Sequence, residues 1–237
     1  MGRDKATLRV GGERLLERQV RVLREAGVSE VALSLGPAAG VRSAGEDAMP
    51  AGGPTDPAAG AAIPSGLPIV RDAAPDAGPL AGIVAGLEWA APRPLLVLAV
   101  DMPRVEPGFL RRLLREAGDP DARDPASRDR PSRSEITPGV APLDRATLSE
   151  IIPGVAPRVR GTDGVERWEP LCAVYPAEAL PEARRRLALD DPRERSPTAL
   201  LDALHAAGLI RACPATAAEA ASLQSWNTPS DLPEADG

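Results

Sequence analysis

Residues 95–103 read LLVLAVDMP. The six apolar residues 95–100 are followed directly by Asp101, Met102 and Pro103. A continuous apolar run is typical of a strand that is covered on both faces in a parallel sheet. In open α/β sheets, ligands bind beyond the carboxyl ends of the strands. Asp101 therefore stands where a ligand site is expected, directly after the clearest strand of the chain.

Helices and strands alternate around this run. Residues 76–90 and 107–118 carry apolar side chains at helical spacing. Upstream, residues 13–27 also predict an amphipathic helix, which leads into a strand at 28–35, and 67–70 is another short strand. This order predicts a doubly wound, mostly parallel α/β fold.

The second half of the chain predicts an antiparallel hairpin in addition to that sheet. A strand after residue 155 is followed by a Gly-Thr-Asp-Gly turn and a returning strand at 170–175. Helices are expected at 177–189 and 197–207, and Ser196 is the expected N-cap of the second.

Two low-complexity stretches interrupt the pattern. Residues 36–66 are mainly Ala, Gly and Pro, and residues 119–150 are rich in Asp, Arg, Pro and Ser. Neither stretch can bury enough apolar surface to offset the entropy lost on ordering. We therefore expect one domain over residues 1–237 with flexible insertions at 36–66 and 119–150, and we expect deletion of 119–150 to preserve fold and activity.

Composition and charge argue against several classes of protein. A net charge of −6 argues against bulk electrostatic binding of nucleic acid. No apolar run is long enough to span a membrane, and the first residues lack the apolar core of a signal peptide. Cys172 and Cys213 have no metal-binding spacing and favour reduced thiols, so a cytoplasmic location is expected.

Three segments are expected at strand ends, and each allows two interpretations. Asp101 could bind Mg²⁺ beside substrate phosphates, and it could equally cap the turn before Pro103. Lys5, in Met-Gly-Arg-Asp-Lys, suits a phosphate contact or plain solvation. Asp72 leads into Gly78–Gly82, which allows close approach of a ligand to a helix N-terminus or is simply a loop.

Six motifs together resemble the molybdenum cofactor guanylyltransferases, which are nucleotidyltransferases with a Rossmann-like sheet. In chain order they are MGRDKA, a G-x-x-L-L-x-R helix, IVRDAAPDAGPLAGIVAGLEWA, LLVLAVDMPRV, RWEPLCAVYP and WNTPSDL. The resemblance covers most of residues 1–118 and 155–232. It implies transfer of GMP from Mg²⁺-GTP to the terminal phosphate of molybdopterin, with release of pyrophosphate. Molybdoenzymes or cofactor-synthesis proteins are the further partners it suggests.

The resemblance also assigns roles to single residues. Lys5 matches a lysine that contacts the nucleotide phosphates, Asp72 an aspartate of the nucleotide site, and Asp101 the Mg²⁺ aspartate. The loop beside the nucleotide is matched by Gly78, Pro79 and Gly82.

Three further matches are looser. Ser34–Gly36 stand where the family contacts the guanine or the ribose. Trp168–Leu171 would line the pterin side, whereas a strand Trp is also typical of core packing. Asn227 matches an asparagine near the metal in related transferases, or caps the helix expected at Thr228.

The chain departs from the family pattern at its start. Family members carry a hydrophobic strand and a Leu-Ala-Gly-Gly-x-Ser-x-Arg loop before Met-Gly-x-Asp-Lys, and neither precedes Met1 here. That loop cradles phosphates through backbone N–H groups, and loss of the strand would leave two strand edges unpaired. We interpret Met1 as an internal residue behind a mis-assigned start.

Two other interpretations stay open. One is a transferase that uses CTP or another phosphorylated acceptor. The other is a truncated, catalytically incompetent homologue that acts as a binding partner.

Overall fold

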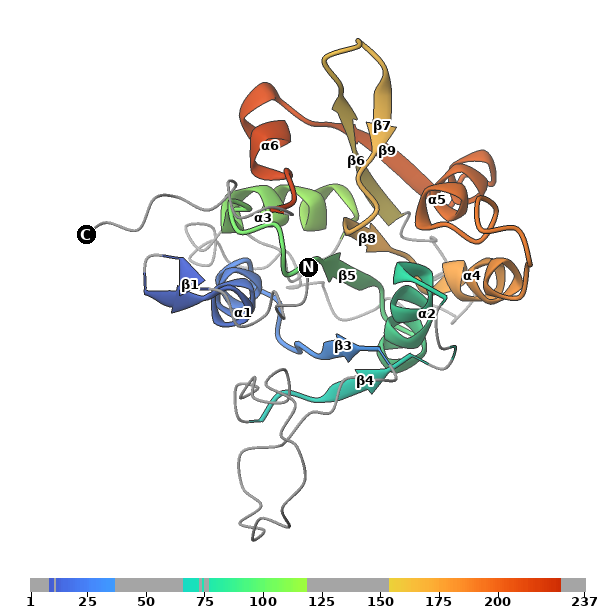
Figure 1. Ribbon diagram of the computed structural model, residues 1–237, viewed down its shortest axis with the longest axis horizontal. Helices are drawn as coiled ribbons and strands as arrows, with labels where there is room; N and C mark the ends of the chain where they lie inside the picture. Colours follow the sequence, from blue (N-terminus) through green and yellow to red (C-terminus); the bar gives the residue numbers. More distant parts are fainter. Residues whose placement is uncertain are drawn as a thin grey trace, which may run out of the picture.

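The computed structural model describes residues 9–10, 12–36, 66–72, 74, 77–118 and 154–226. Most of the strands lie in the middle of the molecule, with the helices α1 (Leu15–Glu25) and α3 (Pro107–Glu116) on one side and the helices α2 (Pro79–Ala90), α4 (Leu180–Leu187) and α5 (Pro197–Ala206) on the other (Figure 1). Lys5, Asn227, the helix expected at Thr228 and nearly all of the two low-complexity stretches lie outside the described residues. In the part described, no helix is long and apolar enough to cross a membrane.

The first half confirms the alternation of helices and strands. Its elements are β1 (Arg9–Val10), β2 (Glu13–Arg14), α1 (Leu15–Glu25), β3 (Leu33–Leu35), β4 (Ile69–Arg71), α2 (Pro79–Ala90), β5 (Leu95–Leu98) and α3 (Pro107–Glu116). The strand expected from residue 28 begins only at Leu33. The reason is that Gly27, with a φ of 100°, and Val28 still belong to the end of α1, where the Val28 N–H donates to the Leu23 carbonyl.

The second half contains the expected hairpin and helices. Its elements are β6 (Gly154–Arg160), β7 (Glu166–Trp168), β8 (Cys172–Tyr175), the short 3₁₀ helix η3 (Ala177–Ala179), α4 (Leu180–Leu187), α5 (Pro197–Ala206), β9 (Ile210–Pro214) and α6 (Ala217–Ser222). Ser196 caps α5, since its Oγ accepts from the Ala199 N–H at 3.1 Å. Sequence reasoning missed β9 and α6, although Thr216 and Glu219 form a capping box, which is a sequence signal for the start of α6.

Among the strands that the structure describes, pairing places β5 at the edge of a sheet. β5 runs antiparallel to β8, with Leu95 opposite Tyr175, and β6 lies between β8 and β7 with β9 parallel to it. β3 and β4 form a separate parallel pair. Among the described strands, the pairs β3–β4 and β6–β9 are parallel. The strands β5, β6, β7 and β8 pair antiparallel with their neighbours in the order β5-β8-β6-β7.

Two apolar cores flank β5. Leu96 and Leu98 pack against the core formed with α1 and α3, whereas Leu95 and Val97 pack against the core formed with α2, α4 and α5. This alternation follows from the two-residue period of a strand. All four residues are nevertheless only half-buried, contrary to the expectation for 95–100, because all four line a cavity.

Burial of two weak acids predicts a loss of stability in alkaline solution. Burial raises the pKa of the Cys172 thiol and of the Tyr175 hydroxyl far above their ordinary values of 9.0 and 10.0. Their contribution to stability is therefore complete below about pH 8 and is lost as the pH rises above it, because the unfolded chain then releases these protons and the folded chain does not. We expect the free energy of unfolding, measured in urea, to fall steadily between about pH 8 and pH 10.5.

The variant Cys172→Ala provides the control for this alkaline loss. It should flatten the part of the fall that begins near the pKa of an exposed thiol. A free energy of unfolding that stays constant across this pH range would contradict the prediction.

Candidate functional site

One part of the site forms where β3 and β4 end. Because Leu35 lies opposite Arg71 in the parallel register, Ser34 and Asp72 come together. The Ser34 hydroxyl donates to Asp72 Oδ1 at 3.0 Å, and the Asp72 N–H donates to the Leu35 carbonyl at 3.3 Å. The half-buried carboxylate of Asp72 is thereby held at the carboxyl end of both strands.

The N-terminus of α2 faces this carboxylate. Gly78 is the N-cap with a φ of 67°, a conformation that favours glycine, and Pro79 occupies the first turn. Gly82 is part of the helix and not of a loop, which corrects the sequence expectation. A Cβ at Gly82 would lie 2.8 Å from Ser34 Oγ and 3.5 Å from Asp72 Oδ1. Glycine at this position lets the helix approach the strand ends closely.

Asp101 follows β5 and is half-buried. Its carbonyl accepts from the Trp226 N–H at 2.8 Å, which ties the C-terminal segment to this strand end. Burial raises the pKa of Glu169, and the negative charge of Asp101 raises it further, while the Leu171 N–H that donates to Glu169 opposes the shift. Glu169 belongs to the segment Trp168–Leu171, which the resemblance places on the pterin side. Sequence reasoning did not predict its burial or the influence of Asp101 on it.

Two side chains of α1 hold the loop that carries Asp101. Gln19 is 3% exposed, and its Nε2 donates to the Ala99 carbonyl at 3.2 Å and to the Met102 carbonyl at 2.7 Å. Arg18 Nε donates to the Pro103 carbonyl. These contacts join residues about eighty positions apart in the chain, so no local pattern could have revealed them.

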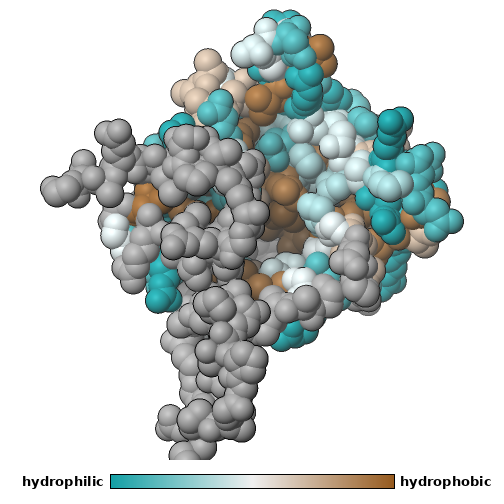
Figure 2. All heavy atoms as spheres, viewed as in Figure 1, coloured by the Kyte–Doolittle hydropathy of each residue, from teal (hydrophilic) through white to brown (hydrophobic). Residues whose placement is uncertain are grey.

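A cavity of about 900 Å³ connects the two strand ends. Figure 2 shows hydrophobic residues in a hollow in the middle of the molecule. Asp72 and Gly78 line one end of the cavity, and so do Pro79 and Gly82. Val100, the residue before Asp101, also lines it. The structure therefore gathers four of the expected site residues and places Asp101 next to the same cavity.

Trp168 does not line this cavity. Its ring is buried, its Nε1 donates to Asp202 Oδ1 at 2.8 Å, and the guanidinium of Arg158 lies 3.8 Å from the ring centre. These contacts place the ring in the core beside α5. Of the segment 168–171, Leu171 lines the cavity.

The carboxylates fit the chemistry of Mg²⁺. No cluster of three potential ligands among His, Cys, Asp and Glu occurs in the described part of the chain. Mg²⁺ does not need such a cluster, because it is commonly bound by one or two carboxylates together with substrate phosphates. Asp101, at a strand end beside the cavity, is a donor of the required kind.

Residues 1–207 match the family described as the MobA-like NTP transferase domain. The chain belongs to this family. It is 34% identical, over 98% of its length and 86% of the relative, to a probable molybdenum cofactor guanylyltransferase of Opitutus terrae. It is 42% identical to a molybdenum cofactor guanylyltransferase of Cereibacter sphaeroides over 50% of this chain and 51% of that protein.

Solved structures of nucleotidyltransferases share the fold. The 2-C-methyl-D-erythritol 4-phosphate cytidylyltransferase of Thermus thermophilus superposes with a TM-score of 0.50 and 20% identity, over 96% of this chain and 90% of its own. A nucleotidyl transferase of Methanothermobacter superposes with a TM-score of 0.51 and 16% identity, over 96% of this chain and 81% of its own. The α/β class and the nucleotidyltransferase activity expected for the family are confirmed.

Proposed function

We propose that this chain transfers GMP from GTP to the terminal phosphate of molybdopterin and releases pyrophosphate. One observation carries the proposal: Asp72 and the N-terminus of α2 meet at one end of a cavity that reaches the strand end before Asp101. The relatives named molybdenum cofactor guanylyltransferase support this choice of nucleotide and acceptor. Molybdoenzymes or cofactor-synthesis proteins are the partners that such a product implies.

The reaction is a displacement at phosphorus. An oxygen of the molybdopterin phosphate forms a bond to the α-phosphorus of GTP, and the bond from that phosphorus to the bridging oxygen breaks. Pyrophosphate leaves with the electron pair of the broken bond. A Mg²⁺ ion, when bound, neutralises charge on the phosphates.

The residues of the chain position the two anions for this reaction. Asp101 would hold the ion, and the first turn of α2, from Gly78, would present backbone N–H groups to a phosphate. Asp72 would orient the nucleotide. Lys5 and Asn227, outside the described residues, are proposed as a phosphate contact and as a residue near the metal.

The test is a competition between nucleotides, with the 237-residue protein, molybdopterin and Mg²⁺. Transfer from GTP, with CTP and ATP at least ~100-fold less efficient, is the expected outcome, since a site that hydrogen-bonds one base rejects others strongly. Preferred transfer from CTP would replace the proposal with a cytidylyltransferase. Absence of both GTP binding and turnover would favour the binding-partner interpretation.

Gly82→Ala is expected to weaken nucleotide binding without unfolding the protein. The added Cβ would lie 2.8 Å from Ser34 Oγ, and Ser34 holds the carboxylate of Asp72. We expect the Kd for GTP, measured by calorimetry, to rise by ~10-fold, as is typical when a supporting hydrogen bond is disturbed.

Gly86→Ala, one turn further along α2, is the matched control. There the Cβ meets the end of the flexible Leu95 side chain, at 2.8 Å, and not the Asp72 site. Gly86→Ala should therefore bind GTP as tightly as the wild type. Equal Kd values for GTP in Gly82→Ala and the wild type would show that Asp72 is not part of the nucleotide site.

A further inference from the structure

We propose that Gln19 is a positioning residue for Asp101, because its side chain clamps the backbone turn that carries this carboxylate. The inference rests on the proposed function, in which Asp101 holds Mg²⁺, and deepens it by giving a residue of α1 a part in metal binding. Gln19 acts through the backbone of the turn, and not through contact with the nucleotide or the metal.

Gln19 is a polar residue at an apolar position of α1. The other buried residues of this helix are all aliphatic, namely Leu15, Leu16, Val20 and Val22. Residues three and four positions apart share one face of a helix, so position 19 lies on the same face as Leu15 and Leu16. Gln19 is only 3% exposed. An apolar side chain would suit this position, so packing alone does not account for an amide there.

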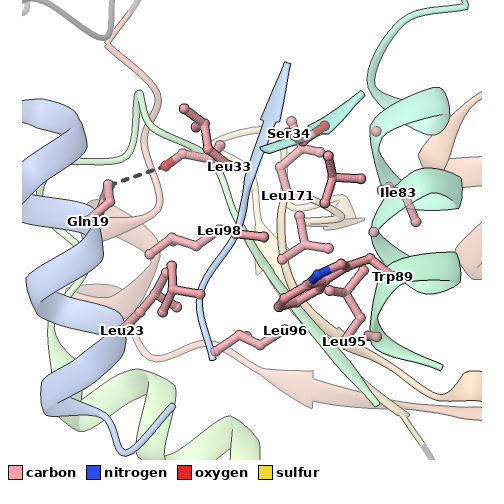
Figure 3. Close-up of a pocket in the computed structure, with 18 of the residues that line it drawn as sticks. Gln19, Leu23, Leu33, Ser34, Ile83, Trp89, Leu95, Leu96, Leu98 and Leu171 are labelled. Atoms are coloured by element: carbon pink, nitrogen blue, oxygen red, sulfur yellow. Dashed lines mark hydrogen bonds between the residues drawn. The ribbon is translucent and has the colours of Figure 1, made fainter. Parts of the chain in front are cut away.

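The amide of Gln19 spans the turn from Ala99 to Met102. Its Nε2 donates to the Ala99 carbonyl at 3.2 Å and to the Met102 carbonyl at 2.7 Å, and Figure 3 shows the first of these bonds as a dashed line. An amide nitrogen carries two N–H donors, and both are used on this one turn. Asp101 lies between the two carbonyls in the chain, so the clamp holds the backbone on either side of it.

The backbone of the turn closes only loosely by itself. The Met102 N–H donates to the Ala99 carbonyl at 3.4 Å, and the Val105 N–H donates to the Met102 carbonyl at 3.3 Å. Ordinary N–H···O bonds measure about 2.7–3.2 Å, so both of these bonds are long and weak. The bond from Gln19 to the Met102 carbonyl, at 2.7 Å, is shorter than either of them. The side chain of Gln19 therefore fixes the turn more firmly than its own backbone does.

The clamp is not needed to satisfy the two carbonyls. Each of them already accepts a backbone N–H, from Met102 or from Val105. Within the described part of the chain, the buried Oε1 of Gln19 has no hydrogen-bond partner. A buried acceptor without a donor destabilises a fold, and an apolar side chain of the same length avoids that cost. Gln19 therefore contributes more to the geometry of the turn than to the stability of the protein.

Two further hydrogen bonds hold the same turn from other elements. The Ala99 N–H donates to the Leu171 carbonyl at 2.8 Å, and the Trp226 N–H donates to the Asp101 carbonyl at 2.8 Å. With the backbone fixed in this way, the place of the Asp101 carboxylate depends only on rotation about its own side-chain bonds. Mg²⁺ demands a near-ideal octahedron of ligands, so a ligand whose backbone shifts binds it less tightly.

Gln19→Met tests the clamp, because methionine is of similar length and has no donor. The probe is the Mn²⁺ complex of GTP, whose Kd is measured by calorimetry without turnover. We expect this Kd to rise by ~10-fold, as is typical when a group that supports a metal ligand is removed. The Met102 and Trp226 amides should exchange hydrogen at least ~10-fold faster than in the wild type. The Tm should stay within ~3 °C of the wild-type value.

Two control variants separate the clamp from general effects. Gln224→Met makes the same substitution at an exposed glutamine and should leave both the Kd and the exchange rates unchanged. Ile210→Val removes one methylene from the core beside α5, so it should lower the Tm and leave the Kd unchanged. If Gln19→Met does not fold, Gln19→Glu keeps the shape of the side chain, turns an oxygen toward the two carbonyls and should weaken binding further.

The outcomes separate this inference from the proposed function. An unchanged Kd in Gln19→Met, in a protein whose wild type transfers GMP, would overturn the inference and leave the function intact. A raised Kd, in a protein whose wild type transfers no GMP, would support the inference and reject the function. An equal rise of the Kd in Ile210→Val would trace the effect to lost stability and overturn the inference. A wild-type protein that does not bind the Mn²⁺ complex of GTP would overturn both.

Discussion

Asp101→Asn is expected to reduce GMP transfer by ~100-fold or more, the loss typical of removing a group that stabilises charge in the transition state. The substitution keeps the size of the side chain and removes the charge that would hold Mg²⁺ beside the phosphates. The carbonyl of residue 101, which accepts from the Trp226 N–H, is unaffected by the change. The measurement is the initial rate of GMP transfer, with Tm recorded for the same preparation.

Asp190→Asn is the matched control for this loss, because Asp190 is exposed in the connection between α4 and α5. It should transfer GMP at the wild-type rate. A Mg²⁺ titration adds a second readout: the Asp101 variant should need a higher Mg²⁺ concentration for half-maximal rate. A wild-type rate and an unchanged Mg²⁺ dependence in the variant would leave Asp101 with the role of a turn residue before Pro103.

Gly154→Ala is expected to destabilise the protein by about 3 kcal/mol, the upper end of what overpacking costs. A Cβ at this position would lie 2.5 Å from the Val174 carbonyl oxygen and 2.6 Å from Pro176 Cδ. Both atoms belong to backbone or to a rigid ring, so neither can rotate away. The strand β6 would have to shift between β8 and β9, which pair with it on either side.

Gly108→Ala provides the matched comparison for the loss at Gly154. Gly108 lies in α3, its φ is outside the left-handed region, and the nearest heavy atom to an added Cβ is Arg111 Nη2 at 4.0 Å. Alanine is the better helix former, so this variant should be stabilised by up to about 1 kcal/mol. Urea unfolding measures both free energies. Similar midpoints for the two variants would contradict the close packing at Gly154.

Much of the candidate site was predictable because its signals are local. Asp101 follows an apolar run, and Gly78 and Pro79 open an apolar helix; both patterns occupy a few consecutive residues. The contacts of Glu169, which lies in the expected segment Trp168–Leu171, and the role of Gln19 were not predictable. Their roles depend on burial and on contacts with Leu171, Ala99 and Met102, which the chain brings together only when it folds.

By itself the sequence determined the helices α1 to α5, the apolar strand at 95–98, the Ser196 cap and the family. These follow from periodicity and short motifs, which depend on neighbours along the chain. Only the tertiary structure decided that β5 is an edge strand among the described strands, that Gly82 and Gly154 have no room for a side chain, and that residues of β3 and β5 line one cavity. Strand pairing and close packing arise between residues far apart in the chain, and no local pattern encodes them.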